Sequence, residues 1–365
     1  MLLWRSGALG DTLLLLPALA ALRQAFPRRR IVAVGNPAAL APATWQGLVD
    51  DIFDAGDRRL APLLMGEPPA PSVLPKGLGT AVVWSGRSDI IGRGLERAGL
   101  TRVITAPILP HEPLPMAWYY LSTLAPLLAA AGMQSLPLGR NVSGSARRPP
   151  RAPILPRSFH ALAVPSPALP LSYTLAAPLS ARLATDAVWA ALCRDAGTGR
   201  EWERRVVFLH PGAGSRLKRW PLDRYLMLAR MLRAGGLVAA WTVGPDEEEL
   251  RAVLRDAGEE AAIVPPLDVA RLAAVLERAA VCVSADCGIA HLAALLGVPV
   301  VALFGPTDDA VWAPPGPHST TLRLELPCAP CAPSGDMTVM RACPSRLCLR
   351  ALPVRPVYEA VRALL

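Results

Sequence analysis

The sequence of 365 residues lacks an uninterrupted apolar stretch long enough to cross a membrane. A spanning helix needs about 20 consecutive apolar residues. Although 52% of the residues are hydrophobic, Pro, Gly or charge cuts each apolar stretch before that length. The signal-like segment Leu13–Leu22 follows Asp11 instead of a basic region, and a strand, turn and helix account for it equally well. We therefore expect a cytoplasmic protein without a transmembrane helix.

Aromatic residues are also scarce, at 5% of the chain, which is thin for a protein that stacks nucleic-acid bases. No zinc-finger, RNP or helix-turn-helix signature accompanies the net charge of +9. The arginine clusters at Arg28–Arg30 and at Arg147, Arg148 and Arg151 would attract acidic lipid or a phosphorylated glycan. Nucleic acid is the weaker candidate, and a GC-rich genome would explain part of the arginine excess.

Lysine is scarce as well, since arginine outnumbers it 36 to 2. One of the two, Lys218, comes just after an apolar strand and the Gly-rich loop HPGAGS. An ammonium group is a compact point charge, whereas a guanidinium is a planar fork. Lys218 therefore indicates a specific demand, such as contact with phosphate, although an accidental surface lysine at a helix start would look the same.

Apolar strands and amphipathic helices alternate through the second half of the chain. The predicted strands are Val206–His210, Leu237–Val243, Ala261–Val264, Val281–Ser284 and Val300–Phe304, and the predicted helices are Leu222–Ala234, Glu247–Ala257, Asp268–Ala279 and Gly288–Leu296. Strands this apolar, separated by single helices, indicate a parallel sheet covered on both faces. The second half is therefore predicted to be a Rossmann-like domain.

The first half begins in the same way. We predict strands at Leu2–Arg5 and Ile31–Val34, a helix at Thr12–Ala25, and further strands in Ala81–Trp84 and Val103–Ile108. These elements indicate a second Rossmann-like domain of the same α/β class.

A change of composition marks the boundary between the two domains. From about residue 142 to 180 the sequence is rich in Pro, Ser and Arg, which is poor material for a regular element. A helix at about 182–195 follows this linker. We therefore predict an N-terminal domain over residues 1–175 and a C-terminal domain over residues 176–365, with a cysteine-rich tail at 328–348.

Three loops, SGALGD, HPGAG and SADCG, follow predicted strands. In open α/β sheets ligands bind outside the carboxyl ends of strands, and a helix that starts there directs N–H groups at an anion. We expect the two sheets to face a central cleft that brings these loops together. Asp11 would then be a general base, or only a helix N-cap, and the two roles are compatible.

Four segments carry a resemblance to a known family: RSGALGDTLLLLPALAALRQAFP, HPGAGSRLKRWPLD, VGPDEEE and SADCGIAHLAALLGVPVVALFGPTD. They occur in order over roughly residues 1–308, and DCGIAHLAALLGVPVVALFGPT is the most specific. Together they resemble glycosyltransferase family 9, the heptosyltransferases of lipopolysaccharide inner-core assembly. The resemblance implies a GT-B fold, with the acceptor mainly on the N-terminal domain and the nucleotide sugar on the C-terminal domain.

The resemblance also implies roles for the residues that match the family's motifs. Asp11 would deprotonate the acceptor hydroxyl for a direct, inverting displacement at the anomeric carbon, without a metal. Lys218 would meet the diphosphate, where neutralising the leaving group's charge gains most of the rate. Asp246 or Glu247 would accept from the ribose hydroxyls, and Arg5 would steady Asp11 or contact the acceptor. The other implied substrate or nucleotide contacts are Gly10, His210, Gly212, Ala213, Gly214, Ser215, Asp286, Gly288 and His291.

Several of these residues also have a plainer structural interpretation. His210 ends a strand and could simply hydrogen-bond a neighbouring loop, and His291 lies on an apolar helix face where a buried histidine is common. Asp286 could be only an N-cap, and Glu247 only a solvated residue of a first helical turn. Trp220 is expected to fix the loop before its helix by packing.

Four of the seven cysteines lie close together with the spacing C-x2-C-x11-C-x4-C. This spacing suits a structural zinc site, while free thiols and a disulfide or redox pair stay open as alternatives. Sequences that resemble the family often carry such a tail. Cys287 stands beside Asp286 where many relatives have Thr, and this departure puts in doubt one side-chain hydrogen bond to the nucleotide sugar that the resemblance would imply. The four tail cysteines are Cys328, Cys331, Cys343 and Cys348.

The sequence and the resemblance together predict an enzyme that moves a heptose or a related sugar from a nucleoside diphosphate to a lipid-linked saccharide. ADP is favoured by the resemblance alone, and no cofactor is expected for catalysis. The basic surface would hold the protein peripherally at the inner membrane. A sugar-nucleotide epimerase of similar fold is an alternative that the GD turn does not support. A non-catalytic sugar-nucleotide-binding protein would keep Lys218 and Asp286 but would not need Asp11.

Overall fold

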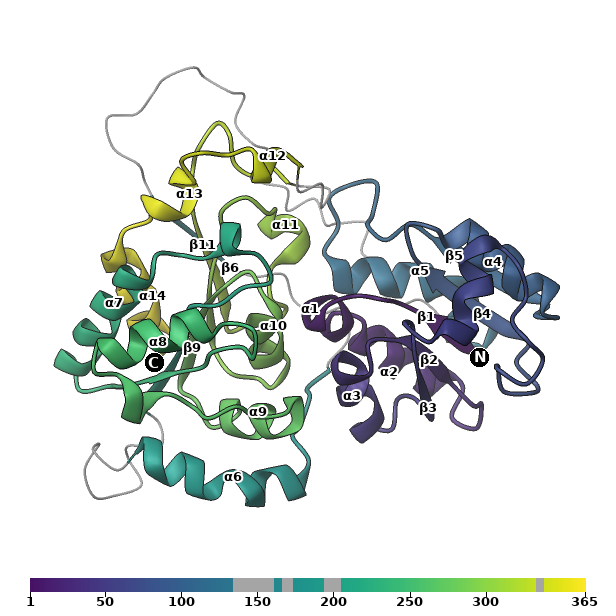
Figure 1. Ribbon diagram of the computed structural model, residues 1–365, viewed down its shortest axis with the longest axis horizontal. Helices are drawn as coiled ribbons and strands as arrows, with labels where there is room; N and C mark the ends of the chain where they lie inside the picture. The colour runs from purple at the N-terminus through teal and green to yellow at the C-terminus, as the bar shows by residue number, and fades with distance from the viewer. Residues whose placement is uncertain (134–160, 166–172, 194–204, 333–337) are drawn as a thin grey trace. The chain divides into compact units, whose positions relative to one another are not determined.

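The computed structural model describes residues 1–133, 161–165, 173–193, 205–332 and 338–365. These residues form two compact units: unit 1 holds 1–133 and Tyr173, and unit 2 holds 161–165 and the described residues from Thr174 onward. Each unit is a sheet of mainly parallel strands flanked by helices (Figure 1). The prediction of two Rossmann-like domains is therefore confirmed. The arginine cluster at 147–151 lies outside the described residues.

Unit 1 is built on five parallel strands in the order β3-β2-β1-β4-β5. The central strand, β1, is fully buried and pairs with β2 on one side and with β4 on the other. The strands are β1 (Leu2–Trp4), β2 (Val32–Gly35), β3 (Asp51–Asp54), β4 (Thr80–Trp84) and β5 (Arg102–Ala106), and the helices are α1 (Leu9–Leu13), α2 (Leu16–Ala25), α3 (Pro37–Trp45), α4 (Ser88–Arg97), α5 (Met116–Ala130) and the 3-10 helix η1 (Arg58–Met65).

The predicted helix Thr12–Ala25 is in fact two helices, α1 and α2. Pro17 lies in the first turn of α2, and because proline has no N–H it cannot continue the hydrogen-bond ladder of α1. The N–H of Leu15 bonds instead to the carbonyl of Thr12, at 3.1 Å, where the chain turns between the two helices. This break makes α1 a short helix that directly follows the loop after β1.

Unit 2 is built on six strands in the order β6-β11-β10-β9-β7-β8. All neighbours are parallel except β6, which is antiparallel to β11. The strands are β6 (Ala161–Pro165), β7 (Val206–His210), β8 (Val238–Trp241), β9 (Val281–Ala285), β10 (Val300–Leu303) and β11 (Ser319–Leu324). The helices are α6 (Leu179–Leu192), α7 (Leu222–Ala234), α8 (Glu248–Asp256), α9 (Val269–Leu276), α10 (Gly288–Leu295), α11 (Asp309–Trp312), α12 (Thr338–Arg341), α13 (Leu347–Arg350) and α14 (Val354–Leu364), with the 3-10 helices η3 (Arg216–Lys218) and η4 (Glu260–Ala262).

Helices cover both faces of the unit 2 sheet. Val207 of β7 belongs to the same buried cluster as Leu228 of α7 and Val357 of α14. Successive side chains of a strand point to opposite faces, and the next residue, Phe208, packs against Trp189 of α6 with ring centroids 6.2 Å apart. The apolar runs that predicted these strands are therefore buried on two sides, as expected.

Two segments differ from the predicted elements. Residues 161–165 lie in the predicted linker but form the edge strand β6, where Pro165 is tolerated because an edge position leaves one side of the strand without a partner. The predicted strand Ala261–Val264 is reduced to a single bridge between Ile263 and Trp241, since η4 occupies its first residues.

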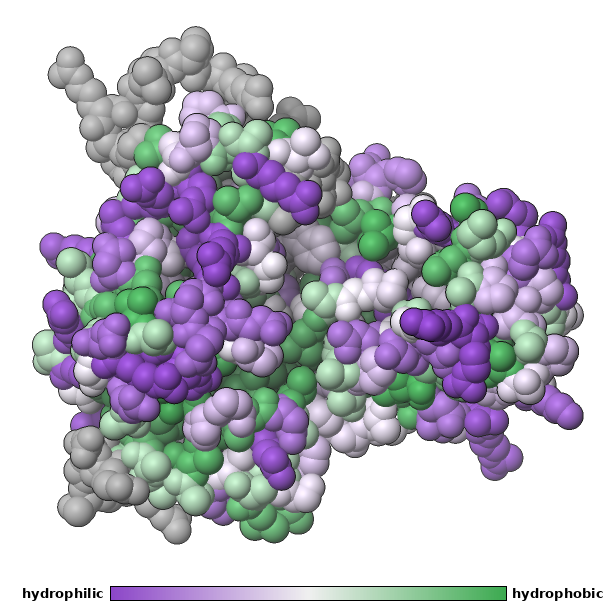
Figure 2. Space-filling model, viewed as in Figure 1, coloured by the Kyte–Doolittle hydropathy of each residue, from purple (hydrophilic) through white to green (hydrophobic). Residues whose placement is uncertain are grey.

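α8 carries an exposed charged face, and hydrophilic side chains cover it in Figure 2. Its buried side includes Arg251 and Leu254, so the helix that the sequence predicted here is amphipathic. Among the residues that the structure describes, no helix has both the length and the apolar character needed to cross a bilayer.

Candidate functional site

Two loops of unit 2 lie where the order of its strands reverses. From β7 the chain adds β8 on one side and later places β9 on the other side of β7. Such a switch point is where open α/β sheets bind their ligands. His210 at the end of β7 is paired in register with Ser284 near the end of β9. The loops HPGAG and SADCG, which follow these strands, therefore lie side by side.

Lys218 and Asp286 form an ion pair at this switch point. Nζ of Lys218 donates to Oδ2 of Asp286 at 3.0 Å, and Asp286 is only 5% exposed. The other oxygen, Oδ1, lies 3.9 Å from Nε2 of the buried His291. The N-cap residue of α10 is Cys287, so Asp286 is not the cap of this helix. The structure thus brings together three predicted site residues from two separate motifs.

Backbone groups add positive potential at the same place. Gly288 is the first residue of α10, and the first N–H groups of a helix have no partner within the helix. Ser215 shapes the turn η3 that presents Lys218: its Oγ accepts from the N–H of Leu217 at 3.3 Å, and its carbonyl accepts from the N–H of Lys218 at 2.9 Å. At Gly214 an added Cβ would meet nothing within 4 Å. An anion with several oxygens would therefore find an ammonium group and backbone donors here.

Glu247 ties the glycine loop to the loop that follows β8. Its carboxylate accepts from the N–H of Ala213 at 3.0 Å, from the N–H of Gly244 at 2.9 Å and from Nη2 of Arg219 at 2.8 Å. The carboxylate lies against the Cα of Gly212, so closely that a Cβ there would overlap it. Glu247 is buried, and three of its roughly four acceptor positions are occupied. It is not the solvated first-turn residue that the sequence allowed, and it shapes the loop.

His210 is buried beside the site, whereas Asp246 is exposed to solvent. Nδ1 of the buried His210 lies 2.9 Å from the carbonyl oxygen of Thr242, which is the structural contact that the sequence allowed. Burial lowers the pKa of His210, but the opposing effect of Cys287 and Glu247 is larger, so the pKa lies above its usual value. Burial raises the pKa of the Cys287 thiol, and His210 outweighs this and lowers it. The contact of Asp246 or Glu247 with the ribose hydroxyls stays a prediction.

Asp11 lies at the switch point of unit 1, where β1 separates β2 from β4. Its Oδ2 accepts from the N–H of Ala8 at 3.0 Å, so it caps α1 from within the first turn and is not the N-cap residue. Its Oδ1 pairs with Nη2 of Arg5 at 2.9 Å, and the two side chains are 24% and 3% exposed. Gly10 precedes Asp11 within α1. The carboxylate is thus held by a buried cation on one side and reaches solvent on the other, as a general base requires.

Three residues of these two sites were missed by the sequence analysis. Arg219 and Gly7 lie inside the motif segments, and this position in the sequence is the signal that could have identified them. In the structure, a Cβ on Gly7 would lie 2.8 Å from the Cβ of Asp11. Tyr120 accepts a hydrogen bond from Nε of Arg5 at 2.7 Å. It is 115 residues away in the chain, and no spacing or motif connects the two.

The four cysteines of the tail are free thiols that lie near one another. Burial, followed by the neighbouring thiols of Cys343 and Cys328, raises the pKa of Cys331, and burial followed by Cys331 raises that of Cys348 to about 11. Within the described parts of the chain, no three His, Cys, Asp or Glu side chains are arranged to hold a metal ion. The donor set is chemically suited to zinc, and the structural zinc site stays a prediction.

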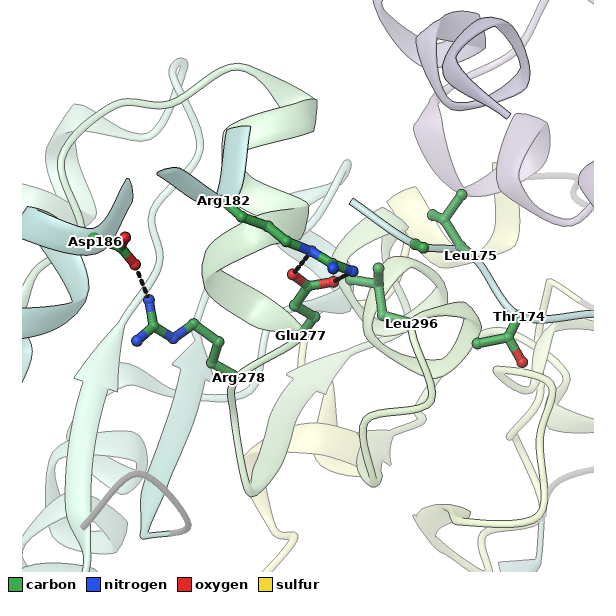
Figure 3. Close-up of a pocket in the computed structure, with 8 residues that line it drawn as sticks. Thr174, Leu175, Arg182, Asp186, Glu277, Arg278 and Leu296 are labelled. Carbon is green, nitrogen blue, oxygen red and sulfur yellow. Dashed lines mark hydrogen bonds and ion pairs between the residues drawn. The ribbon is translucent and has the colours of Figure 1, made fainter. Parts of the chain in front are cut away.

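A cavity of about 590 Å³ lies between α6 and the end of α9, away from the predicted site residues. Figure 3 shows that its charged side chains point toward one another. Arg182 bonds Glu277 at 2.9 Å and Arg278 bonds Asp186 at 2.8 Å. Because these charges are already paired, the cavity offers little to a charged ligand.

Comparison with known proteins agrees with the motifs. The sequence model of glycosyltransferase family 9 (heptosyltransferase) matches residues 157–338. Lipopolysaccharide heptosyltransferase 1 of Pseudomonas aeruginosa is 39% identical over 127 residues, which are 34% of this chain and 36% of that protein. The matched stretch thus spans little more than a third of that relative's length.

Solved structures resemble the whole chain. A glycosyl transferase family 9 protein from Veillonella parvula has a TM-score of 0.69 at 18% identity and covers 100% of this chain and 96% of its own. The ADP-heptose lipopolysaccharide heptosyltransferase II of Escherichia coli has a TM-score of 0.64 at 17% identity, over 100% of this chain and 98% of its own. At such identities the likeness concerns the fold, which is the GT-B type predicted from the sequence.

Proposed function

Because the chain belongs to glycosyltransferase family 9, we propose that it transfers a heptose, or a related sugar, from a nucleoside diphosphate to an acceptor hydroxyl. The observation that carries this proposal is the Lys218–Asp286 pair beside the glycine loop at the switch point of unit 2. Lys218 is one of only two lysines against 36 arginines, and it lies between the glycine loop and the N-terminus of α10. An ammonium group in that position suits a diphosphate.

The donor would bind to unit 2 through its diphosphate. Lys218, together with backbone N–H groups at the start of α10, would meet the phosphate oxygens. These groups stabilise the charge that develops on the leaving nucleoside diphosphate, which is where electrostatic catalysis is most effective. The Escherichia coli enzyme of the same fold is an ADP-heptose heptosyltransferase, and ADP-heptose is therefore the proposed donor.

Asp11 would act on the acceptor, which we assign mainly to unit 1. Its carboxylate takes the proton of the attacking hydroxyl while the hydroxyl oxygen forms a bond to the anomeric carbon. The bond from that carbon to the β-phosphate oxygen breaks, and its electron pair leaves with the nucleoside diphosphate. Attack from the face opposite the leaving group inverts the anomeric configuration. Arg5 keeps the Asp11 carboxylate in place throughout.

The acceptor in this proposal is a saccharide of the lipopolysaccharide-core type or another lipid-linked saccharide. The relative with 39% identity is a lipopolysaccharide heptosyltransferase. The net charge of +9 would favour a phosphorylated acceptor and an acidic membrane surface. We propose that the protein works at the cytoplasmic face of the inner membrane.

The test is a transfer assay with ADP-heptose and a lipid-linked core saccharide, followed by mass spectrometry of the acceptor. Asp11→Asn should lower kcat by about 10²- to 10⁴-fold, the usual contribution of a general base. Asp89→Asn is the matched control, because Asp89 is an exposed acid in the first turn of α4. An equal loss in both variants would contradict the role of Asp11. Donor binding without product in the wild-type protein would favour a non-catalytic binding protein instead.

A further inference from the structure

The arginine that holds Asp11 is itself held from a distant part of unit 1. Arg5 is 2% exposed, and its guanidinium makes three polar contacts. Nε donates to Oη of Tyr120 at 2.7 Å, Nη1 donates to the carbonyl of Ser6 at 2.8 Å, and Nη2 pairs with Oδ1 of Asp11 at 2.9 Å. The planar fork of arginine means that fixing one N–H direction fixes the others.

Tyr120 is a rigid partner for this arginine. It is fully buried in the second turn of α5, and its ring packs edge-on against Trp84 of β4, with centroids 5.5 Å apart at 82°. An aromatic ring in such a contact keeps its orientation. The hydroxyl oxygen therefore stays at one point, where it meets Nε of Arg5.

The hydroxyl is also a neutral partner. Burial raises the pKa of Tyr120 to about 12, so the phenol stays protonated at neutral pH. A second carboxylate in this position would compete with Asp11 for the charge of Arg5, whereas a neutral oxygen orients the guanidinium and leaves its charge for Asp11. Tyr120 is thus suited to aim Arg5 without weakening the Arg5–Asp11 pair.

We propose that Tyr120 is a positioning residue for catalysis, which acts through Arg5 to hold the Asp11 carboxylate toward the acceptor hydroxyl. The proposal rests on the proposed function, since Asp11 is the base only if the protein transfers a sugar. Asp11 is anchored at one oxygen by Arg5 and at the other by the N–H of Ala8. Losing the first anchor would let the carboxylate turn about the second.

The neighbouring tyrosine provides a matched control. The hydroxyl of Tyr119 donates to the carbonyl of Pro107 at 2.6 Å, and its ring lies 5.9 Å from that of Tyr120. Tyr119→Phe therefore removes a partly buried tyrosine hydrogen bond from the same helix, and none of the hydrogen bonds to Arg5 is lost. Tyr120→Phe removes only the oxygen that Arg5 contacts.

The experiment measures transfer kinetics and donor affinity for both variants. Tyr120→Phe should lower kcat about tenfold, as expected when a catalytic group is misplaced by a fraction of an ångström. Its donor Kd should not change, because the donor contacts lie in unit 2, and Tyr119→Phe should keep the wild-type kcat. In an Asp11→Asn background, Tyr120→Phe should cause no further loss. A full additional loss there, or equal kcat in the two tyrosine variants, would overturn the proposal.

A spectroscopic measurement separates positioning from general stability. The Nε–Hε signal of Arg5, assigned by its loss in Arg5→Lys, should exchange slowly with water in wild type and Tyr119→Phe and rapidly in Tyr120→Phe. Slow exchange in all three would refute the Tyr120 contact. A wild-type protein without transferase activity would instead refute the proposed function, and this role with it. That result is distinct from an active wild type with an equally active Tyr120→Phe variant, which refutes the positioning role alone.

Discussion

Gly212→Ala should be far more damaging than Gly214→Ala, although both glycines lie in one loop. A Cβ on Gly212 would overlap the carboxylate of Glu247, while a Cβ on Gly214 would meet nothing within 4 Å. The φ of neither glycine lies in the left-handed region, so alanine is allowed by the backbone at both. The difference between the variants therefore isolates the contact with Glu247.

The size of the effect follows from the bonds of Glu247. The methyl group would displace the carboxylate from the N–H groups of Ala213 and Gly244, and each buried donor left without a partner costs about 1–3 kcal/mol. Replacing glycine by alanine also lowers the conformational entropy of the unfolded chain, which stabilises the folded protein by about 0.4–1 kcal/mol. We expect Gly212→Ala to destabilise unit 2 by about 1–6 kcal/mol and Gly214→Ala to be neutral or slightly stabilising.

The assay is urea unfolding of the full chain, followed by tryptophan fluorescence, for Gly212→Ala, Gly214→Ala, Glu247→Ala and the double variant Gly212→Ala/Glu247→Ala. In the double variant the clash is gone, so its destabilisation should be well below the sum of the two single changes. Equal stability of the two glycine variants, or strict additivity in the cycle, would refute the idea that Glu247 and Gly212 fit together.

Two further predictions concern unit 2. Glu259 accepts from Nη1 of Arg233 and Nε1 of Trp241, both at 2.7 Å. Burial raises its pKa, but these partners outweigh burial and lower it below the usual 4.5. Glu259→Gln should therefore cost about 1–2 kcal/mol at neutral pH. The gap should narrow as pH falls below the ordinary value of 4.5 and close once the pH is below the lowered pKa of the folded protein, where the folded carboxylate also protonates; a gap that persists in acid by urea unfolding would contradict this. The purified protein should also carry zinc by elemental analysis, lost in Cys331→Ser and kept in Cys193→Ser, and a metal-free wild-type protein would rule out the tetrathiolate site.

The central strands could be predicted well because their sequence signal is local. Val206–His210 and Leu222–Ala234 have the predicted bounds, since a short apolar run and an amphipathic helix each have a clear period and clear ends. The edge pairing of β6 with β11 could not be predicted, because it joins residues 155 to 163 positions apart and one strand lies in a Pro-rich segment. Pairing over such a distance leaves no local pattern.

The candidate site was predictable where residues share a motif. Lys218, Asp286 and His291 were singled out by their loops, and the strand order brings those loops together. The inward direction of Glu247 depends on how two loops pack, and Tyr120 reaches Arg5 from a helix with no motif of its own. Such contacts are decided by tertiary packing, which the spacing of residues along the chain does not record.

The most direct test of the nucleotide-sugar site is calorimetric titration with ADP, GDP and UDP. The protein's other lysine, Lys76, is exposed in unit 1, so Lys76→Ala is the matched control for Lys218→Ala. We predict that ADP binds preferentially, that Lys218→Ala weakens it about 10- to 100-fold through the loss of a charged hydrogen bond, and that Lys76→Ala leaves it unchanged. Equal affinity in the two variants, or no nucleotide binding to the wild-type protein, would contradict the account.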